Sequence, residues 1–156
     1  MVYFVHLTEG RGKCMSGVRD ILQERELFHV EENDTVASVV RRMAEIHVGA
    51  ILVLEGEQLR GVFSERDLMR RVVLERLDPE VTPVKDVMST EIATIDEAAS
   101  LEDAMEAMHA HNCRHLPVTR GSRVVAFLSM RDLMKHELAR KTEDLQHLAA
   151  YIHRSS

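Results

Sequence analysis

The chain has 156 residues, 45% of them hydrophobic and 29% charged, with a formal net charge of −6. This composition is typical of one globular domain, and the acidic balance argues against a general nucleic-acid surface, which normally needs a basic face. No apolar run approaches the roughly 18 residues of a membrane span, and the N-terminal residues lack the positive leader of a signal peptide. We therefore expect a cytoplasmic protein that neither spans a membrane nor serves as a nucleic-acid surface.

The first half of the chain predicts a strand, a helix, two strands and a second helix. Residues 1–17 have no clear period and are expected to be partly disordered. The strands are expected at 27–30, 50–54 and 59–63, the first helix after Asp34 or Thr35, and the second helix over 65–77. Pro79 and Pro83 end this helix and favour an extended linker over residues 79–83.

The second half predicts the same order of elements. Its strands are expected at 92–95, 116–119 and 124–128, with one helix opened by Ser100 and another running from Met130 to about residue 153. The last helix carries a short heptad-like seam, interrupted by Lys141, that consists of Leu138, Leu145, Leu148 and Ile152. This seam favours packing against its own domain or a second copy over a free coiled coil.

The two halves are copies of one unit. The segment Ser64–Met69 returns as Ser129–Met134, shifted by 65 positions. The same shift relates positions in a helix, a strand and a turn, namely Met43 and Met108, Val53 and Val118, and Gly56 and Gly121. A smaller echo relates residues 18–22 to residues 84–88 with a shift of 66. One shift across several elements indicates an internal duplication.

The duplication predicts one α/β fold in which both copies share a core around a pseudo-two-fold axis, because a unit of about 60 residues is marginal alone. The expected division is an N-terminal extension (1–17), two repeats (18–78 and 84–138), a linker (79–83) and a C-terminal helical extension (139–156).

A polar turn precedes the second helix of each copy. Ser64 with Asp67, and Ser129 with Asp132, have the spacing of a capping box, which explains these residues structurally. An arginine precedes each aspartate and a small residue, Gly61 or Ala126, lies three positions before each serine, although capping needs neither. A helix N-terminus with a hydroxyl and an arginine can bind a phosphate. An adjacent carboxylate can accept hydrogen bonds from both hydroxyls of a ribose. The same residues can therefore cap the helix and bind a nucleotide.

These features resemble a known family. The order strand, helix, strand, strand, helix, the pattern G-h-h-S-x-x-D-h (h apolar) after a hairpin, and the strand Arg114–Val118 are similar to the tandem CBS domain, named after cystathionine β-synthase. The resemblance covers about residues 15–138. It implies an α/β (α+β) fold of two β-α-β-β-α repeats packed as a pseudo-two-fold pair. It also implies clefts that bind AMP, ADP or ATP and, in some members, NAD(H) or S-adenosylmethionine.

The resemblance also implies roles for particular residues. Asp67 and Asp132 are expected to hold ribose hydroxyls, with Ser64 and Ser129 beside them. The other candidates are Arg66, Arg131, Arg114 and His115 for phosphate, and Leu27 and Ile92 for the adenine pocket. The first copy has Gly49 where the second has Arg114, so unequal use of the two clefts is expected.

Other chemistry has weaker support in the sequence. His109, His111, Cys113 and His115 alternate along the chain, but they align with Ala44, Ile46, Val48 and Ala50, which favours ordinary packing over a metal site. Cys14 and Cys113 fit a reduced compartment and have no assignable base, so both are expected to be inert.

No catalytic base, nucleophile, metal, catalytic cofactor or phosphate-binding GxxxxGK[ST] loop is expected, so the leading hypothesis is a non-enzymatic, stand-alone nucleotide sensor that regulates an unidentified protein partner. The alternatives are an NAD(H)-binding redox sensor on the same fold and a structural adaptor with vestigial sites. The resemblance further implies a homodimer, and the second helices are expected to offer apolar surface at Leu68, Val72 and Leu133.

Overall fold

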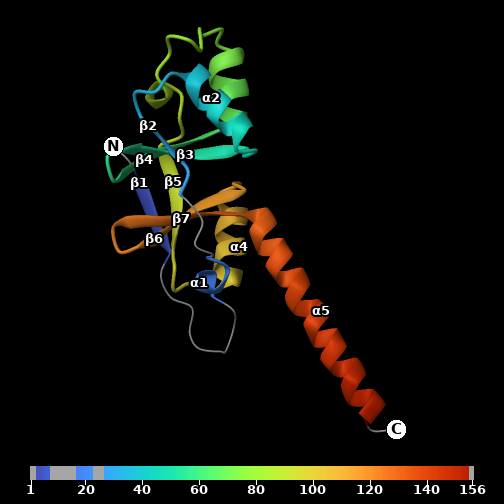
Figure 1. Ribbon diagram of the computed structural model, residues 1–156. Helices are drawn as coiled ribbons and strands as arrows, with labels where there is room; N and C mark the ends of the chain where they lie inside the picture. The colour runs from blue at the N-terminus through green and yellow to red at the C-terminus, as the bar shows by residue number, and fades with distance from the viewer. Residues whose placement is uncertain (1–2, 8–16, 23–26, 155–156) are drawn as a thin grey trace.

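The computed structural model describes residues 3–7, 17–22 and 27–154. Its strands form one four-stranded and one three-stranded sheet, with helices packed against them (Figure 1). In chain order the elements are β1 (Tyr3–Leu7), α1 (Val18–Ile21), β2 (His29–Glu31), α2 (Val36–Glu45), β3 (Ala50–Glu55), β4 (Gln58–Ser64), α3 (Glu65–Asp67), the π-helix η1 (Leu68–Val73), the 3-10 turn η2 (Val84–Asp86), β5 (Glu91–Asp96), α4 (Leu101–Ala110), β6 (His115–Arg120), β7 (Arg123–Ser129) and α5 (Met130–Arg154).

The two sheets repeat one internal pattern. In the three-stranded sheet, β2 pairs with β3 in parallel, and β3 pairs with β4 antiparallel, which places Ala50 opposite Ser64. In the other sheet, β5 pairs with β6 in parallel, and β6 pairs with β7 antiparallel, which places His115 opposite Ser129. Thr35 and Ser100 cap the equivalent helices α2 and α4. The predicted mixed fold of two β-α-β-β-α repeats is therefore confirmed.

The structure differs from the sequence predictions at two elements. Residues 1–17 show no period, yet Tyr3–Leu7 forms β1, which pairs in parallel with β5. The predicted second helix of the first copy begins as expected, but α3 passes after one turn into η1, where the Leu74 N–H donates to the Met69 carbonyl at 3.1 Å. Side-chain periodicity carries no signal for this wider i to i−5 bonding.

The two repeats share apolar packing, as the duplication predicts. A buried cluster joins Leu52, Leu54 and Leu59 of the first repeat to Ile92 and Val124 of the second. Leu27, Val62 and Phe127 pack against this cluster and are partly buried. Because both sheets contribute, neither repeat could expose this surface to water without a substantial loss of hydrophobic stabilisation.

The first segment of each repeat packs on the other repeat. Val18 of α1 is fully buried in the core of the second repeat, and its N–H donates to the Ala99 carbonyl at 2.9 Å. Val84 of η2 is fully buried in the core of the first repeat, and its N–H donates to the Asp34 carbonyl at 2.8 Å. These are the two segments related by the shift of 66. Each repeat is therefore completed by the leading segment of the other.

A buried carboxylate holds α1 on the second repeat. The Glu97 side chain is 5% exposed and accepts hydrogen bonds from Arg120 at 2.6 and 2.7 Å and from Arg19 at 2.7 Å. The hydrogen bonds from Arg120 and then Arg19 lower the pKa of Glu97 to about 2. Glu97 is thus ionised at neutral pH, and its hydrogen bonds link α1 to β6.

The second helices present a different apolar surface from the one predicted. Val72 and Leu133 are buried and Leu68 is partly buried, so these residues belong to the repeat cores and do not form a surface for a second copy. A core-facing residue recurs every three to four positions, and the next residue along faces solvent. The exposed apolar side chains accordingly include Met69, Val73, Leu74, Met134, Leu138 and Leu145.

Candidate functional site

The polar turn of the first repeat forms the capping box that its spacing predicts. The Ser64 N–H and hydroxyl donate to Asp67 Oδ2 at 2.9 and 2.6 Å, and the Asp67 N–H donates to Ser64 Oγ at 3.3 Å. This arrangement fixes the Asp67 side chain at the first turn of α3, and only 8% of the residue is exposed.

The second oxygen of Asp67 has partners that the sequence analysis missed. The Ser89 hydroxyl donates to Asp67 Oδ1 at 2.9 Å, and Arg71 Nε lies 3.7 Å from the same oxygen. Ser89 is held there because its N–H and carbonyl pair with Val62 on β4 at 2.9 and 3.0 Å. The Arg71 guanidinium also donates to the Met88 carbonyl. Arg71 follows Asp67 by one helical turn, which is the only sequence signal that could have identified it.

A polar hollow lies beside this carboxylate. It has a volume of about 390 Å³ and is lined by Arg71, Ser89, Thr90 and Glu91. A guanidinium and two hydroxyl-bearing residues are groups that bind phosphate or sugar hydroxyls. Glu91 brings a negative charge to the same hollow, which disfavours a highly charged anion there.

The polar turn of the second repeat has the same capping geometry. The Ser129 N–H and hydroxyl donate to Asp132 Oδ2 at 3.1 and 2.5 Å, and the Asp132 N–H donates to Ser129 Oγ at 3.2 Å. Arg131 lies in the same first turn of α5 and is exposed. The capping explanation and the ligand explanation therefore coexist at both turns.

The start of the central strand lies against the helix N-terminus in both repeats, but with different side chains. The Met130 N–H donates to the Arg114 carbonyl at 2.9 Å, and the equivalent Glu65 N–H donates to the Gly49 carbonyl at 3.1 Å. The second repeat therefore places an exposed arginine beside its turn. In the first repeat the Glu65 carboxylate covers the glycine, since a Cβ on Gly49 would lie 3.2 Å from Glu65 Oε2.

His115 lies where these charges meet. Its ring centroid is 5.3 Å from that of Phe127, and burial, followed by the Arg114 charge, lowers its pKa from the ordinary value of 6.5. The charges of Asp132 and Glu65 act in the opposite direction. The structure thus brings Arg114, His115, Arg131 and Asp132 of the second repeat together, and Glu65 of the first repeat contributes a carboxylate.

The remaining predicted residues lie at the contact between the two repeats. Arg66 Nη1 donates to the Asn112 carbonyl at 3.3 Å, so this arginine reaches from the first repeat to the second. Leu27 and Ile92, the adenine candidates, both belong to the cluster between the repeats, where Ile92 is buried and Leu27 partly buried.

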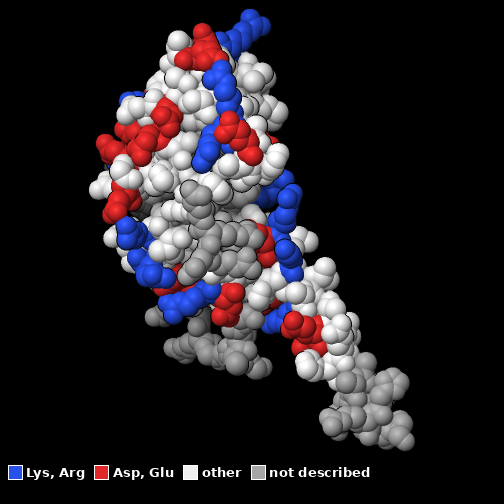
Figure 2. All heavy atoms as spheres, in the orientation of Figure 1, with Lys and Arg blue, Asp and Glu red and all other residues white. Residues whose placement is uncertain are grey.

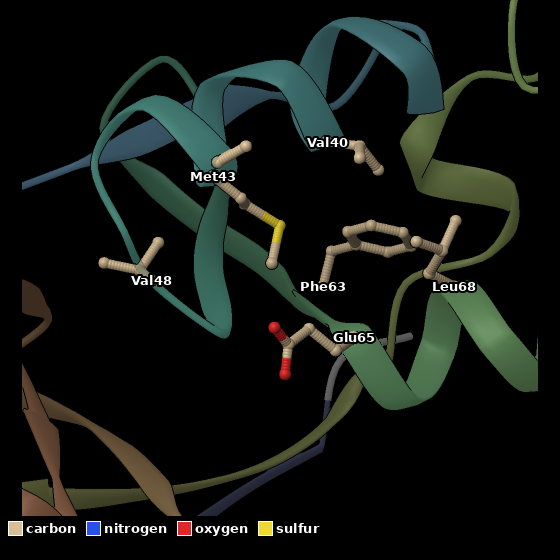
Figure 3. A pocket seen from close by; sticks show the side chains of 7 residues that line it. Val40, Met43, Val48, Phe63, Glu65 and Leu68 are labelled. Carbon is tan, nitrogen blue, oxygen red and sulfur yellow. The ribbon is translucent and has the colours of Figure 1, made fainter.

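A separate apolar pocket of about 170 Å³ lies within the first repeat, between α2 and the helix that begins at Glu65 (Figure 3). Met43, Phe63 and Leu68 line it together with Val40, Ala44 and Val48, and Glu65 is its only charged residue. Figure 3 shows the Glu65 carboxylate directed away from the aromatic ring of Phe63. The second repeat has Met105 and Met130 at the positions of Val40 and Glu65.

The histidine-rich segment assembles no metal site in the part of the chain that the structure describes, where no group of three or more His, Cys, Asp and Glu side chains is placed to hold an ion. Burial raises the pKa of the Cys113 thiol, and Cys14 lies outside the described residues. Among the described helices, none combines the length and apolar character needed to cross a membrane.

Comparison with known proteins agrees with this architecture. The sequence model of the CBS domain matches residues 18–74 and again residues 84–139. The chain belongs to the CBS-domain family. It is 32% identical to the CBS domain-containing protein YhcV of Bacillus subtilis (strain 168) over 128 residues, which cover 82% of this chain and 90% of YhcV. CBS pairs of this kind are regulatory modules.

Solved CBS structures superpose on both repeats. A CBS-domain protein of Burkholderia ambifaria is 32% identical, with a TM-score of 0.76 over 80% of this chain and 95% of that chain. The CBS domain protein PAE2072 of Pyrobaculum aerophilum, which was solved in complex with AMP, is 28% identical, with a TM-score of 0.68 over 75% of this chain and 89% of that chain.

Proposed function

We propose that this CBS pair is a non-catalytic regulatory module that binds an adenosine nucleotide between its repeats, AMP in the first place and also ADP or ATP. The observation that carries the proposal is the convergence of Arg114, His115, Arg131 and Asp132 at the N-terminus of α5. The AMP complex of the related Pyrobaculum aerophilum protein supports this choice of ligand.

Each group has a role suited to its chemistry. The Asp132 carboxylate accepts hydrogen bonds from the ribose hydroxyls, and the Ser129 hydroxyl lies beside it. Arg114 and Arg131 supply positive charge to the phosphate at the positive end of the helix dipole. His115 is held neutral at pH 7 by its lowered pKa, and it donates one hydrogen bond from its ring. Leu27, in the cluster between the repeats, contributes apolar surface for the base.

The first repeat is proposed as the weaker site. The second repeat adds Arg114 and His115 beside its turn, whereas the first repeat has Gly49 and Ala50 at these positions. Glu65 also places a carboxylate where the second repeat has an uncharged methionine, and it repels phosphate. Ile92, Ser64, Arg66 and the newly identified Arg71 are the other residues proposed to contact a nucleotide there.

Calorimetric titration of the full chain with AMP, ATP and NADH tests this function. We expect AMP to bind, and native mass spectrometry to report one tightly bound nucleotide per chain. Tighter binding of NADH than of AMP would favour a redox sensor on the same fold. Absence of heat with every nucleotide would contradict the proposal and favour a structural adaptor.

We also propose that the module acts as a homodimer and passes its ligand state to a protein partner through a change in packing. The support is an apolar surface repeated by the duplication. Met69 and Met134 are equivalent and exposed, and so are Val73 and Leu138. A monomer mass near 17.8 kDa in light scattering at micromolar concentration would overturn the dimer.

A further inference from the structure

The C-terminal helix continues well beyond the repeat to which it belongs. The first turns of α5 pack inside the second repeat, where Leu133 is fully buried. The helix then projects away from both sheets to Arg154 (Figure 1). All side chains from Lys141 to His147 are exposed. An isolated helix of about 15 residues is marginal in water, so packing against a partner would stabilise the projecting part.

One face of this helix is apolar and exposed. Leu138 and Leu145 are 69% and 70% exposed, although leucine is a residue that proteins bury. Met134, Leu138, Lys141 and Leu145 follow one another at intervals of four, three and four residues, which is the spacing of the contact face in a coiled coil. Leu148 and Ile152 continue the interval in the sequence.

We propose that residues 134–152 of α5 pair with the same segment of a second copy, and that the two helices run antiparallel. This inference rests on the proposed homodimer and goes beyond it, because it assigns the contact to the projecting helix and fixes the direction of the partner. The contact face has the same sequence in both copies, so a second copy supplies matching apolar positions without any other protein.

Lys141 decides the direction. In a parallel, in-register pair the two Lys141 side chains face each other in the contact layer, where like charges repel and both ammonium groups lose water. In an antiparallel pair centred near residue 143, Lys141 faces Leu145 of the second copy. Its methylene stem packs on that leucine while the ammonium group remains at the edge of the contact.

The charges along the helix agree with this direction. Before the centre, three basic side chains (Lys135, Arg140 and Lys141) outnumber one acidic side chain, Glu137, which pairs with Arg140 at 3.3 Å. The acidic Glu143 and Asp144 lie at the centre and just after it. Figure 2 shows charged side chains of both signs along the projecting helix, with uncharged surface between them. An antiparallel second copy places Asp144 next to Lys141, so that opposite charges meet at the edge of the layer.

Sedimentation equilibrium of the full chain and three variants tests the contact. L145D puts a carboxylate into the proposed layer, and we expect the dimer dissociation constant to rise roughly tenfold or more, because two buried leucines are lost per dimer. K141L adds apolar surface and should strengthen the dimer. Q146D introduces the same charge one residue away, outside the seam, and should leave the dissociation constant within about twofold. All these side chains are exposed in the monomer, so the fold is preserved.

Cysteine cross-linking tests the direction. In a chain that carries C14S and C113S, single variants K141C and L145C are oxidised separately and then as a mixture. We expect a disulfide-linked dimer only in the mixture, since residue 141 faces residue 145 of the other copy.

Cross-linking of L145C with itself would overturn the antiparallel arrangement. A wild-type dimer that L145D does not weaken would overturn the helix contact while leaving the proposed dimer intact. A monomeric wild type would overturn both. Nucleotide titration of L145D separates these outcomes from the proposed ligand function, because the segment 134–152 contains none of the proposed ligand residues.

Discussion

Asp67 and Asp132 occupy equivalent positions in the two turns but have different surroundings. We predict that Asp132→Ala weakens AMP binding by about ten- to a hundredfold, the loss expected for one or two charge-assisted hydrogen bonds. Asp67→Ala should weaken it less, because the second repeat adds Arg114 and His115 beside its turn, whereas Glu65 covers Gly49 in the first repeat. Calorimetric titration of both variants measures the difference.

The melting temperature of each variant shows whether the substitution also disturbs the fold. Asp67→Ala leaves the Ser89 hydroxyl without its acceptor in a partly buried place, so its melting temperature should also fall. Equal losses of AMP affinity in the two variants would contradict the proposed ranking of the sites.

The lowered pKa of His115 predicts that the stability of the fold depends on pH. Burial lowers its pKa in the folded state below the ordinary value of 6.5, so the unfolded chain takes up a proton first as the pH falls. The free energy of unfolding should therefore decrease as the pH drops from 6.5 through the lower folded-state pKa. His115→Gln should remove this part of the slope. Urea unfolding at several pH values between about 7.5 and 5 measures it, and an unchanged slope in the variant would contradict the assignment.

At the residue scale, the sequence predicted hydrogen-bonded residue pairs that are close in the chain and missed pairs that are far apart in it. Ser64 with Asp67 was predictable because three residues separate a cap from its partner. Ser89 could not be predicted, since it lies 22 positions from Asp67 and arrives there only through the exchanged segment. The placement of Glu65 over Gly49 likewise depends on a side-chain rotamer, which repeat alignment does not determine.

At the scale of elements, the structure explains why a glycine, Gly61, stands on β4, whereas the sequence only marked the position. The sequence shows it as a small residue three positions before Ser64 that capping does not require. In the structure, the approaching groups include Met88 and Ser89, since a Cβ on Gly61 would lie 2.9 Å from the Ser89 carbonyl and closer still to the Met88 sulfur. The glycine therefore admits the segment that delivers Ser89 to Asp67.

We predict that Gly61→Ala destabilises the protein by roughly 1–3 kcal/mol, the usual cost of overpacking. It should also weaken any nucleotide binding at the first repeat, because Ser89 and Thr90 are displaced. Ala126→Gly is the matched change in the second repeat and should cost no more than about 1 kcal/mol. Urea unfolding of both variants gives the comparison. A Gly61→Ala protein as stable as wild type would show that the segment can move aside freely.

The type of most elements followed from local pattern, while their partners did not. The buried run of β3 and the caps of α2 and α4 were predictable from periodicity and capping residues. β1 was missed because its pairing partner, β5, lies almost ninety residues further along the chain, with Tyr3 opposite Glu91. The π-helix η1 was missed because its period is close to that of an α-helix over one turn.

At the scale of the whole molecule, the duplication predicted a shared core but not the exchange of leading segments. A constant shift in residue number indicates that two units are similar. It does not indicate which copy a connecting segment packs against. The exchange makes the repeats interdependent, because Val18 completes the second repeat and Val84 completes the first. Fragments that contain one repeat alone would each lack one such residue.

This interdependence predicts one cooperative unfolding transition. Val18→Ala removes fully buried methyl groups from the second repeat and should lower the free energy of unfolding by roughly 1–3 kcal/mol. Because the two repeats also share the cluster around Leu52 and Ile92, hydrogen exchange through global unfolding should accelerate in both repeats. Val81→Ala, at an exposed position outside the proposed dimer surface, is the control and should change stability by less than about 0.5 kcal/mol. Mass spectrometry of exchanged peptides resolves the repeats, and acceleration confined to the second repeat would mean that the two copies unfold independently.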